Sequence, residues 1–223
     1  MRRAVIDIET LGNNFGSFDE VQQHYLLKYA STEAEREEAL QRLSLYPLTA
    51  QIIVIGILDP ETGQATVCYQ APGAAEEERR DGEAQFMTGS EPELLARFWS
   101  AIEGCAQIIT FNGRGFDCPF LLLRSAMLGI QPTRDLMPYR YDPGKHCDLL
   151  DQFTFYGAVR RFDLDFYCKA FSIDSPKSHG IVGLDLQRLF EEGRYREIAE
   201  YNLGDLRATA SLFRAWERFL ARS

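Results

Sequence analysis

The strongest constraint on this chain lies near its amino end, in the segment Arg3-Ala4-Val5-Ile6-Asp7-Ile8-Glu9-Thr10. Its aliphatic and β-branched residues predict a short buried strand. Successive strand residues point to opposite faces, so Asp7 and Glu9 share one face, about 7 Å apart. Two such acids repel each other and lose hydration unless a cation compensates them. Because hard divalent ions such as Mg²⁺ prefer carboxylate oxygens, the pair predicts one wall of a metal site, the alternative being an ordinary strand end whose acids reach solvent.

The composition narrows the class of protein. The chain has 223 residues, enough for one sizeable domain, with 45% hydrophobic and 26% charged residues as in ordinary soluble proteins. It contains no apolar run of the roughly 20 residues that a membrane helix needs, and its start does not read as a signal peptide. The five cysteines form no C-x-x-C pair. We therefore expect a cytoplasmic protein with reduced thiols and no membrane contact.

The net charge of −9 is unevenly distributed. Residues 1–111 carry 8 Lys and Arg against 18 Asp and Glu, whereas residues 112–180 carry 9 against 8. Coating of duplex DNA needs a broad basic face, which this balance does not predict. The middle region, with many Arg, Lys and Tyr residues, is still available to bind phosphates transiently.

Apolar periodicity predicts an alternation of strands and helices. Strands are expected over 3–10, 51–58, 65–70, 107–111 and 146–150. Helices are expected over 31–43, 91–103, 117–128, 164–170, 184–192 and 195–221. The Gly-, Glu- and Arg-rich residues 71–90 predict a mobile loop. This order predicts one α/β domain over residues 1–223, with a mixed five-stranded sheet flanked by helices.

Two later segments carry further candidates for chemistry. In Phe111-Asn112-Gly113-Arg114-Gly115-Phe116-Asp117 a strand enters a glycine-rich turn, and an acid stands in the first turn of the next helix. Asp117 could serve only to interact with the helix dipole. On the final helix Tyr201 and Asp205 are four residues apart, so their side chains share one face.

Taken together, these segments resemble a known family. D-x-E, N-x-x-x-F-D and Y-x-x-x-D, in this order, look like the three motifs of DEDD-type 3′–5′ exonucleases, and the tyrosine marks the DEDDy branch. QIIVIGI, HCDLLD and KSHGIVGLDLQRLFEEGRYREIAEYNLGDL are similar to stand-alone exonucleases related to the proofreading domain of family B DNA polymerases. The resemblance runs from Arg3 to about Phe213 and is weakest over 11–47 and 71–90.

The resemblance implies a ribonuclease H-like fold with two Mg²⁺ or Mn²⁺ ions. Asp7, Glu9, Asp117 and Asp205 would surround the ions, which could clamp the attacking and leaving oxygens of a phosphodiester. Tyr201 would orient the attacking water through its hydroxyl, because a reference pKa near 10 makes a free phenolate base unfavourable.

The same resemblance extends to substrate contacts. Asn112 and Phe116 would hold the terminal nucleotide, Phe116 by packing on its base or sugar. Lys177 stands where relatives also tend to have a lysine, and would touch a phosphate unless it is simply solvated.

Several other residues keep two interpretations. Asp148 and Asp151 could support the site or act as ordinary caps and surface acids. The loop residues Arg134, Arg140, Lys145, Tyr139 and Tyr141 could guide a single strand or form an ordinary polar loop. His146, Cys147 and Asp148 are consecutive, so they cannot all face one ion, and Cys118 is expected to be a packing residue.

The expected function is metal-dependent 3′–5′ exonucleolysis of single-stranded nucleic acid, DNA rather than RNA. The first alternative is a non-catalytic nucleic-acid-binding module on the same fold, which the presence of all four acids and the tyrosine disfavours. The second is an exoribonuclease, which would need contacts to the 2′-hydroxyl that the sequence does not reveal. The sequence shows no polymerase domain, so we expect no proofreading within this chain, and it identifies no protein partner.

Overall fold

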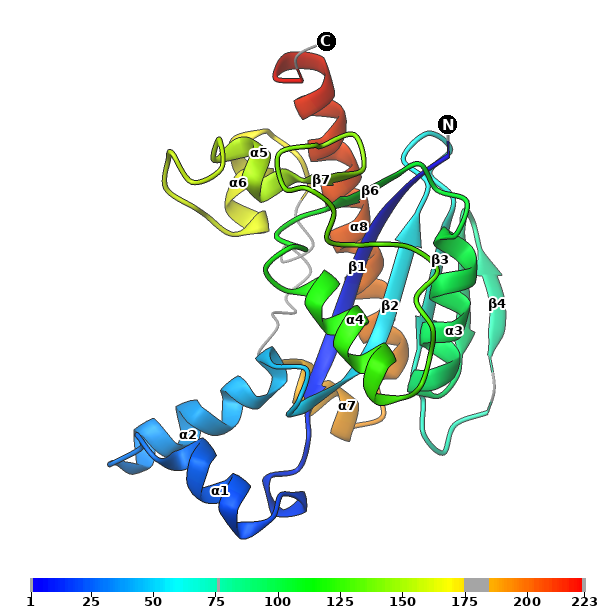
Figure 1. The fold of residues 1–223 in the computed structure, drawn as a ribbon. Helices are drawn as coiled ribbons and strands as arrows, with labels where there is room; N and C mark the ends of the chain where they lie inside the picture. The colour runs from blue at the N-terminus through cyan, green and yellow to red at the C-terminus, as the bar shows by residue number, and fades with distance from the viewer. Residues whose placement is uncertain (1, 76, 175–184, 222–223) are drawn as a thin grey trace.

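A computed structural model describes residues 2–75, 77–174 and 185–221. Its centre is a seven-stranded mixed sheet in the order β4-β5-β3-β2-β1-β6-β7 (Figure 1). The strands are β1 (Arg3–Gly12), β2 (Ala50–Leu58), β3 (Ala65–Tyr69), β4 (Glu78–Asp81), β5 (Ala84–Thr88), β6 (Gln107–Thr110) and β7 (His146–Asp148). Strands β1, β2 and β3 pair antiparallel, while β6 runs parallel to both β1 and β7. The α/β class and the mixed sheet are confirmed.

Helices cover both faces of this sheet (Figure 1). They are α1 (Glu20–Leu27), α2 (Glu33–Gln41), α3 (Glu91–Ile102), α4 (Asp117–Met127), α5 (Leu149–Phe153), α6 (Leu164–Ala170), α7 (Leu186–Glu191) and α8 (Tyr195–Phe219). In one hydrophobic core, helices α5, α6, α7 and α8 pack on the face of the sheet that bears Val5 and Val54. In the other, α3 and α4 pack on the face that bears Ile6 and Ile55. Among the described helices, none has the length and apolar content needed to cross a lipid bilayer.

The segment 71–90 corrects the predicted strand count of five. It contains the hairpin β4–β5 instead of being a loop throughout, and β5 extends the sheet by pairing in parallel with β3. All four residues of β4 are charged and exposed, so no apolar alternation marks this strand. Its pairing depends on β5, which buries Ala84 and Phe86 against the sheet.

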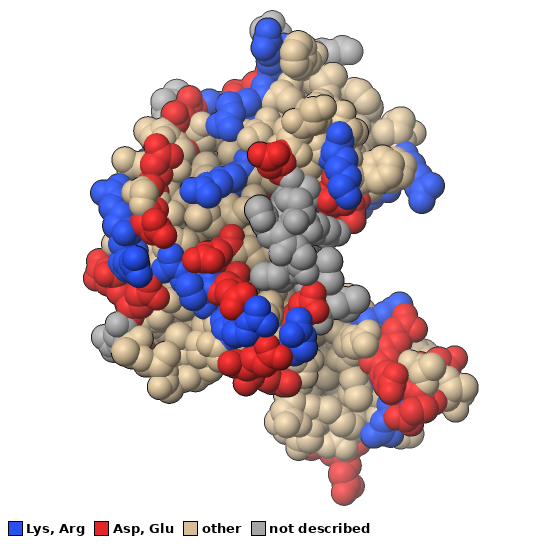
Figure 2. Space-filling view, turned by 180° about the vertical axis from the view of Figure 1, so that it is seen from behind, with Lys and Arg blue, Asp and Glu red and all other residues tan. Residues whose placement is uncertain are grey.

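A helical arm projects from the end of β1, at the opposite end of the molecule from the end of α8 (Figure 1). It comprises α1 and α2, and neither helix has a buried residue. The acid-rich α2 was predicted, but α1 was missed because it has no clear apolar face; a capping box formed by Asp19 and Gln22 begins it. Figure 2 shows a hollow between this arm and the main body.

Close packing of α8 on β2 requires a glycine at position 56. A Cβ atom there would lie 2.0 Å from Asn202 Oδ1 and 2.6 Å from Leu206 Cδ1. Gly56 is also the antiparallel partner of Asp7. The absence of a side chain at this position therefore lets α8 approach the part of β1 that carries the acids.

We expect Gly56→Ala to destabilise the protein by about 1–3 kcal/mol, because Asn202 and Leu206 must move to admit the methyl group. The urea midpoint of unfolding measures the change. Gly104→Ala is the control, since a Cβ atom at residue 104 would meet no other atom within 4 Å. Equal midpoints for the two variants would show that α8 does not need a glycine in β2.

Candidate active site

Three carboxylates from two distant parts of the chain meet in the structure. Asp7 and Glu9 come from β1 and Asp205 from α8, and one oxygen of each lies within 4.8 Å of the others. Strand alternation directs residues 7 and 9 to the face that also carries Val5, which packs in the same core as α8. Within the described ranges, this is the one group of three or more acidic, His or Cys side chains close enough to hold a metal ion.

Asp117 joins this group through a gap between two strands. The ladder between β1 and β6 ends at the pair Val5–Ile109, and beyond it α4 brings Asp117 beside β1. The Asp117 carboxylate Oδ1 accepts a hydrogen bond from the Ile8 backbone N–H at 3.1 Å. Ile8 lies between Asp7 and Glu9, so all four predicted acids surround one stretch of β1.

Burial makes the ionised form of these carboxylates unfavourable. It raises the pKa of Asp7 and of Glu9 well above the usual range, and the neighbouring acids raise both further. It also raises the pKa of Asp117 to about 7, although the N–H groups of Ile8 and of Asp117 itself counteract part of this change. Oxygen donors that repel one another are the ligand set that hard divalent cations compensate, so these acids are chemically suited to bind such ions.

Asn202 is a site residue that the sequence analysis missed. Its side chain is buried on α8, and its Nδ2 donates to Asp7 Oδ2 at 2.7 Å. A hydrogen bond from Asn202 also lowers the pKa of Glu9, opposing the effect of burial. Asn202 precedes Asp205 by three residues and therefore shares its helical face. That spacing was the available signal, but it does not reveal which strand the amide contacts.

Asp148 supports the turn that carries Asn112. Its two carboxylate oxygens accept the backbone N–H groups of Asn112 and Arg114, each at 2.9 Å. The carboxylate also accepts from Leu150 N and caps α5, so both interpretations of this acid apply. Asn112 adopts a left-handed conformation with φ 64°, which is uncommon outside glycine. A buried acceptor thus holds an unusual turn beside the carboxylates.

The remaining predicted residues are placed as follows. Phe116 is partly buried at the start of α4, with its ring centroid 5.0 Å from that of Phe120. Tyr201 is partly buried on α8; burial and the nearby Asp205 and Glu9 raise its pKa, so the hydroxyl keeps its proton. Lys177 lies outside the described residues.

Other reactive side chains have structural roles. Burial lowers the pKa of His146 to about 4, and its ring contacts Thr110 Oγ1 and Leu136 O. Asp151 forms ion pairs with Arg140 and Arg161. All five cysteines are buried and free, and burial raises the pKa of Cys118 well above its usual range. These groups are therefore poor candidates for nucleophiles.

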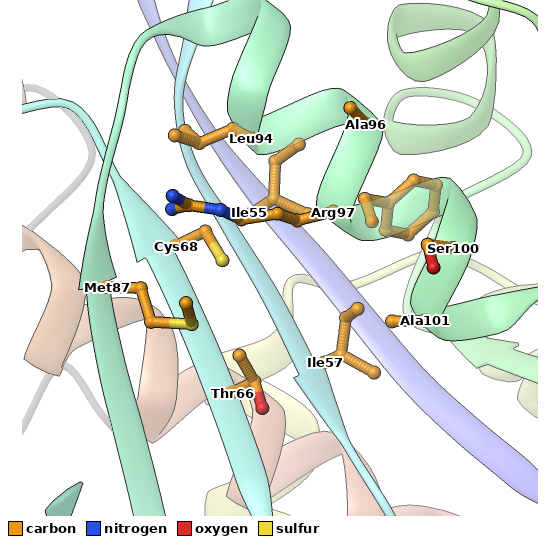
Figure 3. A pocket seen from close by; sticks show the side chains of 11 residues that line it. Ile55, Ile57, Thr66, Cys68, Met87, Leu94, Ala96, Arg97, Ser100 and Ala101 are labelled. Atoms are coloured by element: carbon orange, nitrogen blue, oxygen red, sulfur yellow. The ribbon is translucent and has the colours of Figure 1, made fainter. Parts of the chain in front are cut away.

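An apolar pocket of about 480 Å³ lies elsewhere, between α3 and strands β2, β3 and β5 (Figure 3). Ile55, Ile57, Cys68 and Met87 line its sheet side. The Arg97 guanidinium at this pocket donates to Thr88 O. Since Ile55 and Cys68 belong to the core beneath α3, the pocket is on the opposite face of the sheet from α8 and has no carboxylate cluster.

Comparisons with known proteins identify the family of this chain. A model of the family described as predicted 3′–5′ exonucleases related to the exonuclease domain of PolB matches residues 82–221. The chain belongs to this family. The matched range includes Asp117, Tyr201 and Asp205, and begins after the two acids of β1.

The relatives of this chain include much longer proteins. DNA polymerase 1 of Sulfolobus acidocaldarius is 29% identical over 141 residues, 60% of this chain and 16% of the polymerase. DNA polymerase 1 of Saccharolobus solfataricus is 27% identical over 140 residues, covering 59% of this chain and 16% of that protein. The chain thus spans about a sixth of the length of the curated relatives it matches.

The fold has a solved counterpart. The family B DNA polymerase of the hyperthermophilic archaeon Pyrobaculum calidifontis superposes with a TM-score of 0.63 over 98% of this chain and 25% of the polymerase. The sequence identity is 16%, so this likeness concerns the fold alone. It agrees with the ribonuclease H-like architecture inferred from the motifs.

We expect Asp117→Asn to stabilise the metal-free protein near pH 8. Below about pH 4 the folded and unfolded chains both keep the Asp117 proton; toward pH 7 the unfolded chain loses it first, so folding becomes less favourable. An amide keeps the acceptor for Ile8 N–H without a charge. The gain should be at least about 1 kcal/mol, or roughly 2–4 °C in Tm.

Thermal unfolding in EDTA between pH 5 and pH 8 measures this difference, which should grow with pH. Asp135→Asn is the control, because Asp135 is exposed and also accepts a backbone hydrogen bond. A lower Tm for Asp117→Asn at pH 8 would contradict the proposed repulsion among the acids.

Proposed function

We propose that this chain is a metal-dependent 3′–5′ exonuclease that removes nucleotides from the 3′ end of single-stranded DNA, with residues 1–223 as one exonuclease domain. The observation that carries the proposal is the convergence of Asp7, Glu9 and Asp205, with Asp117 bonded to the intervening Ile8. Membership of the PolB-related exonuclease family supports the reaction type.

The donor set fits two Mg²⁺ or Mn²⁺ ions. The four acids supply the carboxylate oxygens that such ions prefer. Glu9, Asp117 and Asp205 are buried and Asp7 is half-buried, so bound ions would relieve their mutual repulsion. Bound ions would supply Lewis-acid stabilisation of the phosphodiester and lower the pKa of water. Asn202 would restrict the rotation of Asp7 through its hydrogen bond and so orient a ligand.

Tyr201 would act as an orienting hydroxyl. Its raised pKa keeps the phenol protonated, so it can donate to and accept from a water molecule but cannot remove a proton as a phenolate. Asn112 and Phe116 would hold the terminal nucleotide beside Asp117. Asp148 would act through Asn112 by fixing the turn on which it stands.

Two features support single-stranded DNA as the substrate. On the face shown in Figure 2, Lys and Arg residues are interspersed with Asp and Glu and do not gather into one basic surface. Such a face suits transient contact with a chain end better than tight binding of a duplex. The curated relatives are DNA polymerases, which favours DNA over RNA.

The central test is a gel time course on 5′-labelled single strands of DNA and RNA, each with Mg²⁺, Mn²⁺ or EDTA. We expect shortening by one nucleotide at a time from the 3′ end of DNA, abolished by EDTA. Asp205→Ala should lower the rate at least about 100-fold, because a ligand is lost. Glu200→Ala, which removes an exposed acid from the same helix, is the control. Strands that are bound but never shortened would contradict the exonuclease and favour a binding module.

We expect Tyr201→Phe to reduce kcat by about tenfold or more while leaving the fold intact, because only the hydroxyl that orients water is removed. Single-turnover kinetics with saturating enzyme measure this step. Tyr195→Phe changes α8 in the same way at a hydroxyl that bonds Pro72 O, and should keep the wild-type rate. An unchanged rate in Tyr201→Phe would remove the role assigned to the hydroxyl.

A further inference from the structure

Three tyrosine rings contact one another at steep interplanar angles of 60° and 56°. Tyr139 and Tyr141 have ring centroids 5.6 Å apart, and those of Tyr141 and Tyr156 are 4.7 Å apart. Tyr139 is 74% exposed and Tyr141 57% exposed, so their rings are accessible to a ligand. We call these three residues the aromatic platform. They come from two separate segments, the loop before β7 and the turn after α5.

One side of the platform is a turn with an unusual backbone conformation, which hydrogen bonds keep in place. Phe155 and Tyr156 are consecutive residues in left-handed conformations, with φ 49° and 58°, followed by Gly157 at φ 95°. Such conformations are unfavourable for bulky residues and persist where surrounding contacts impose them. Here Tyr156 N–H donates to Asp151 O at 2.7 Å, and Gly157 N–H donates to Thr154 O at 3.1 Å. The chain thus keeps a strained turn that leaves Phe155 59% exposed and sets Tyr156 against Tyr141.

Guanidinium groups accompany the rings. Arg140 lies between Tyr139 and Tyr141 in the sequence. Both Arg140 and Arg161 form ion pairs with the buried carboxylate of Asp151. Two cations share one acid there, and their side chains remain 45% and 53% exposed. The neighbouring Arg160 lies over the ring of Phe162 at 4.9 Å. This surface therefore combines exposed aromatic rings with guanidinium groups that remain partly exposed.

The platform is joined to the candidate active site by hydrogen bonds. Arg114 belongs to the glycine-rich turn, and its guanidinium donates to Pro138 O at 2.9 Å, immediately before Tyr139. Asp148 binds the same turn and begins α5, whose end leads to Tyr156. In Figure 1 the loop before β7 and the α5–α6 region lie beside the turn that leads into α4. Both halves of the platform are thus anchored to the turn that carries Asn112.

We propose that the aromatic platform binds the bases of single-stranded nucleic acid upstream of the terminal nucleotide, with Arg140 and Arg161 contacting its phosphates. This inference rests on the proposed function for the position of the 3′ end. Stacking on tyrosine accepts any base, and guanidinium groups bind phosphates, so the site would take strands of any sequence. Such a site gives an exonuclease a grip that moves along the strand after each cleavage.

The test measures binding separately from cleavage. Fluorescence anisotropy of a 5′-fluorescein-labelled strand of 12 thymidylates, in EDTA, compares wild type with Tyr139→Ala/Tyr141→Ala. Both side chains are exposed, so the double variant should fold, which its Tm checks. We expect its Kd to rise at least tenfold. Tyr25→Ala/Tyr29→Ala, in and just after α1, removes two comparably exposed tyrosines elsewhere and should bind like wild type.

A second measurement separates this inference from the proposed function. With Mg²⁺, the ratio of kcat/KM for the 12-mer to that for a thymidylate dinucleotide should fall at least tenfold in the platform variant, mainly through KM. A wild-type protein that binds the 12-mer but cleaves neither substrate would contradict the exonuclease, and the anisotropy would still decide the platform. The proposal would be wrong if the platform variant bound the 12-mer within twofold of wild type, or if the Tyr25/Tyr29 variant lost as much affinity. It would also be wrong if the wild-type protein did not bind the 12-mer. The aromatic surface would then be a candidate contact for a protein partner.

Discussion

The main physical constraint on this structure is the repulsion among the carboxylates that it brings together. Asp7, Glu9, Asp117 and Asp205 come from three elements, and each raises the free energy of the others when ionised. The fold tolerates them because the surrounding contacts are made elsewhere: two apolar cores on opposite faces of the sheet bury most of the large side chains. Stability is thus supplied by the cores, while the acids raise one another's pKa and are neutralised either by protons or by bound cations.

The elements around these acids are arranged to bring backbone close to backbone. Gly56 lets α8 lie against β2, which places Asp205 and Asn202 over β1. The separation of β1 and β6 beyond Val5 leaves room for the start of α4, where the Asp117 carboxylate accepts the N–H of Ile8. One missing side chain and one short ladder therefore decide whether the four acids meet.

A second layer of polar contacts links this centre to the periphery. Asp148 holds the turn of Asn112 and begins α5, and Arg114 reaches from the same turn to the loop of Tyr139. These bonds tie the placement of a terminal nucleotide to that of the aromatic platform, so the two proposed contacts with the strand share one support. The apolar pocket beneath α3 lies on the face of the sheet opposite α8.

Local patterns in the sequence determined most elements and the identity of the acids. The alternation in β1 put Asp7 and Glu9 on one face, and the helical spacing did the same for Tyr201 and Asp205, because both periods are properties of the backbone. Tertiary structure alone decided what no local pattern encodes. The strand β4 exists only through its pairing with β5, Asn202 matters only because Asp7 lies opposite it, and Tyr156 completes a platform with residues 15 or more positions away. The contacts of Asn202 with Asp7 and of Tyr156 with Tyr141 join segments that lie apart in the sequence, and the β4–β5 hairpin is added to the sheet through the pairing of β5 with β3, so no local period reveals them.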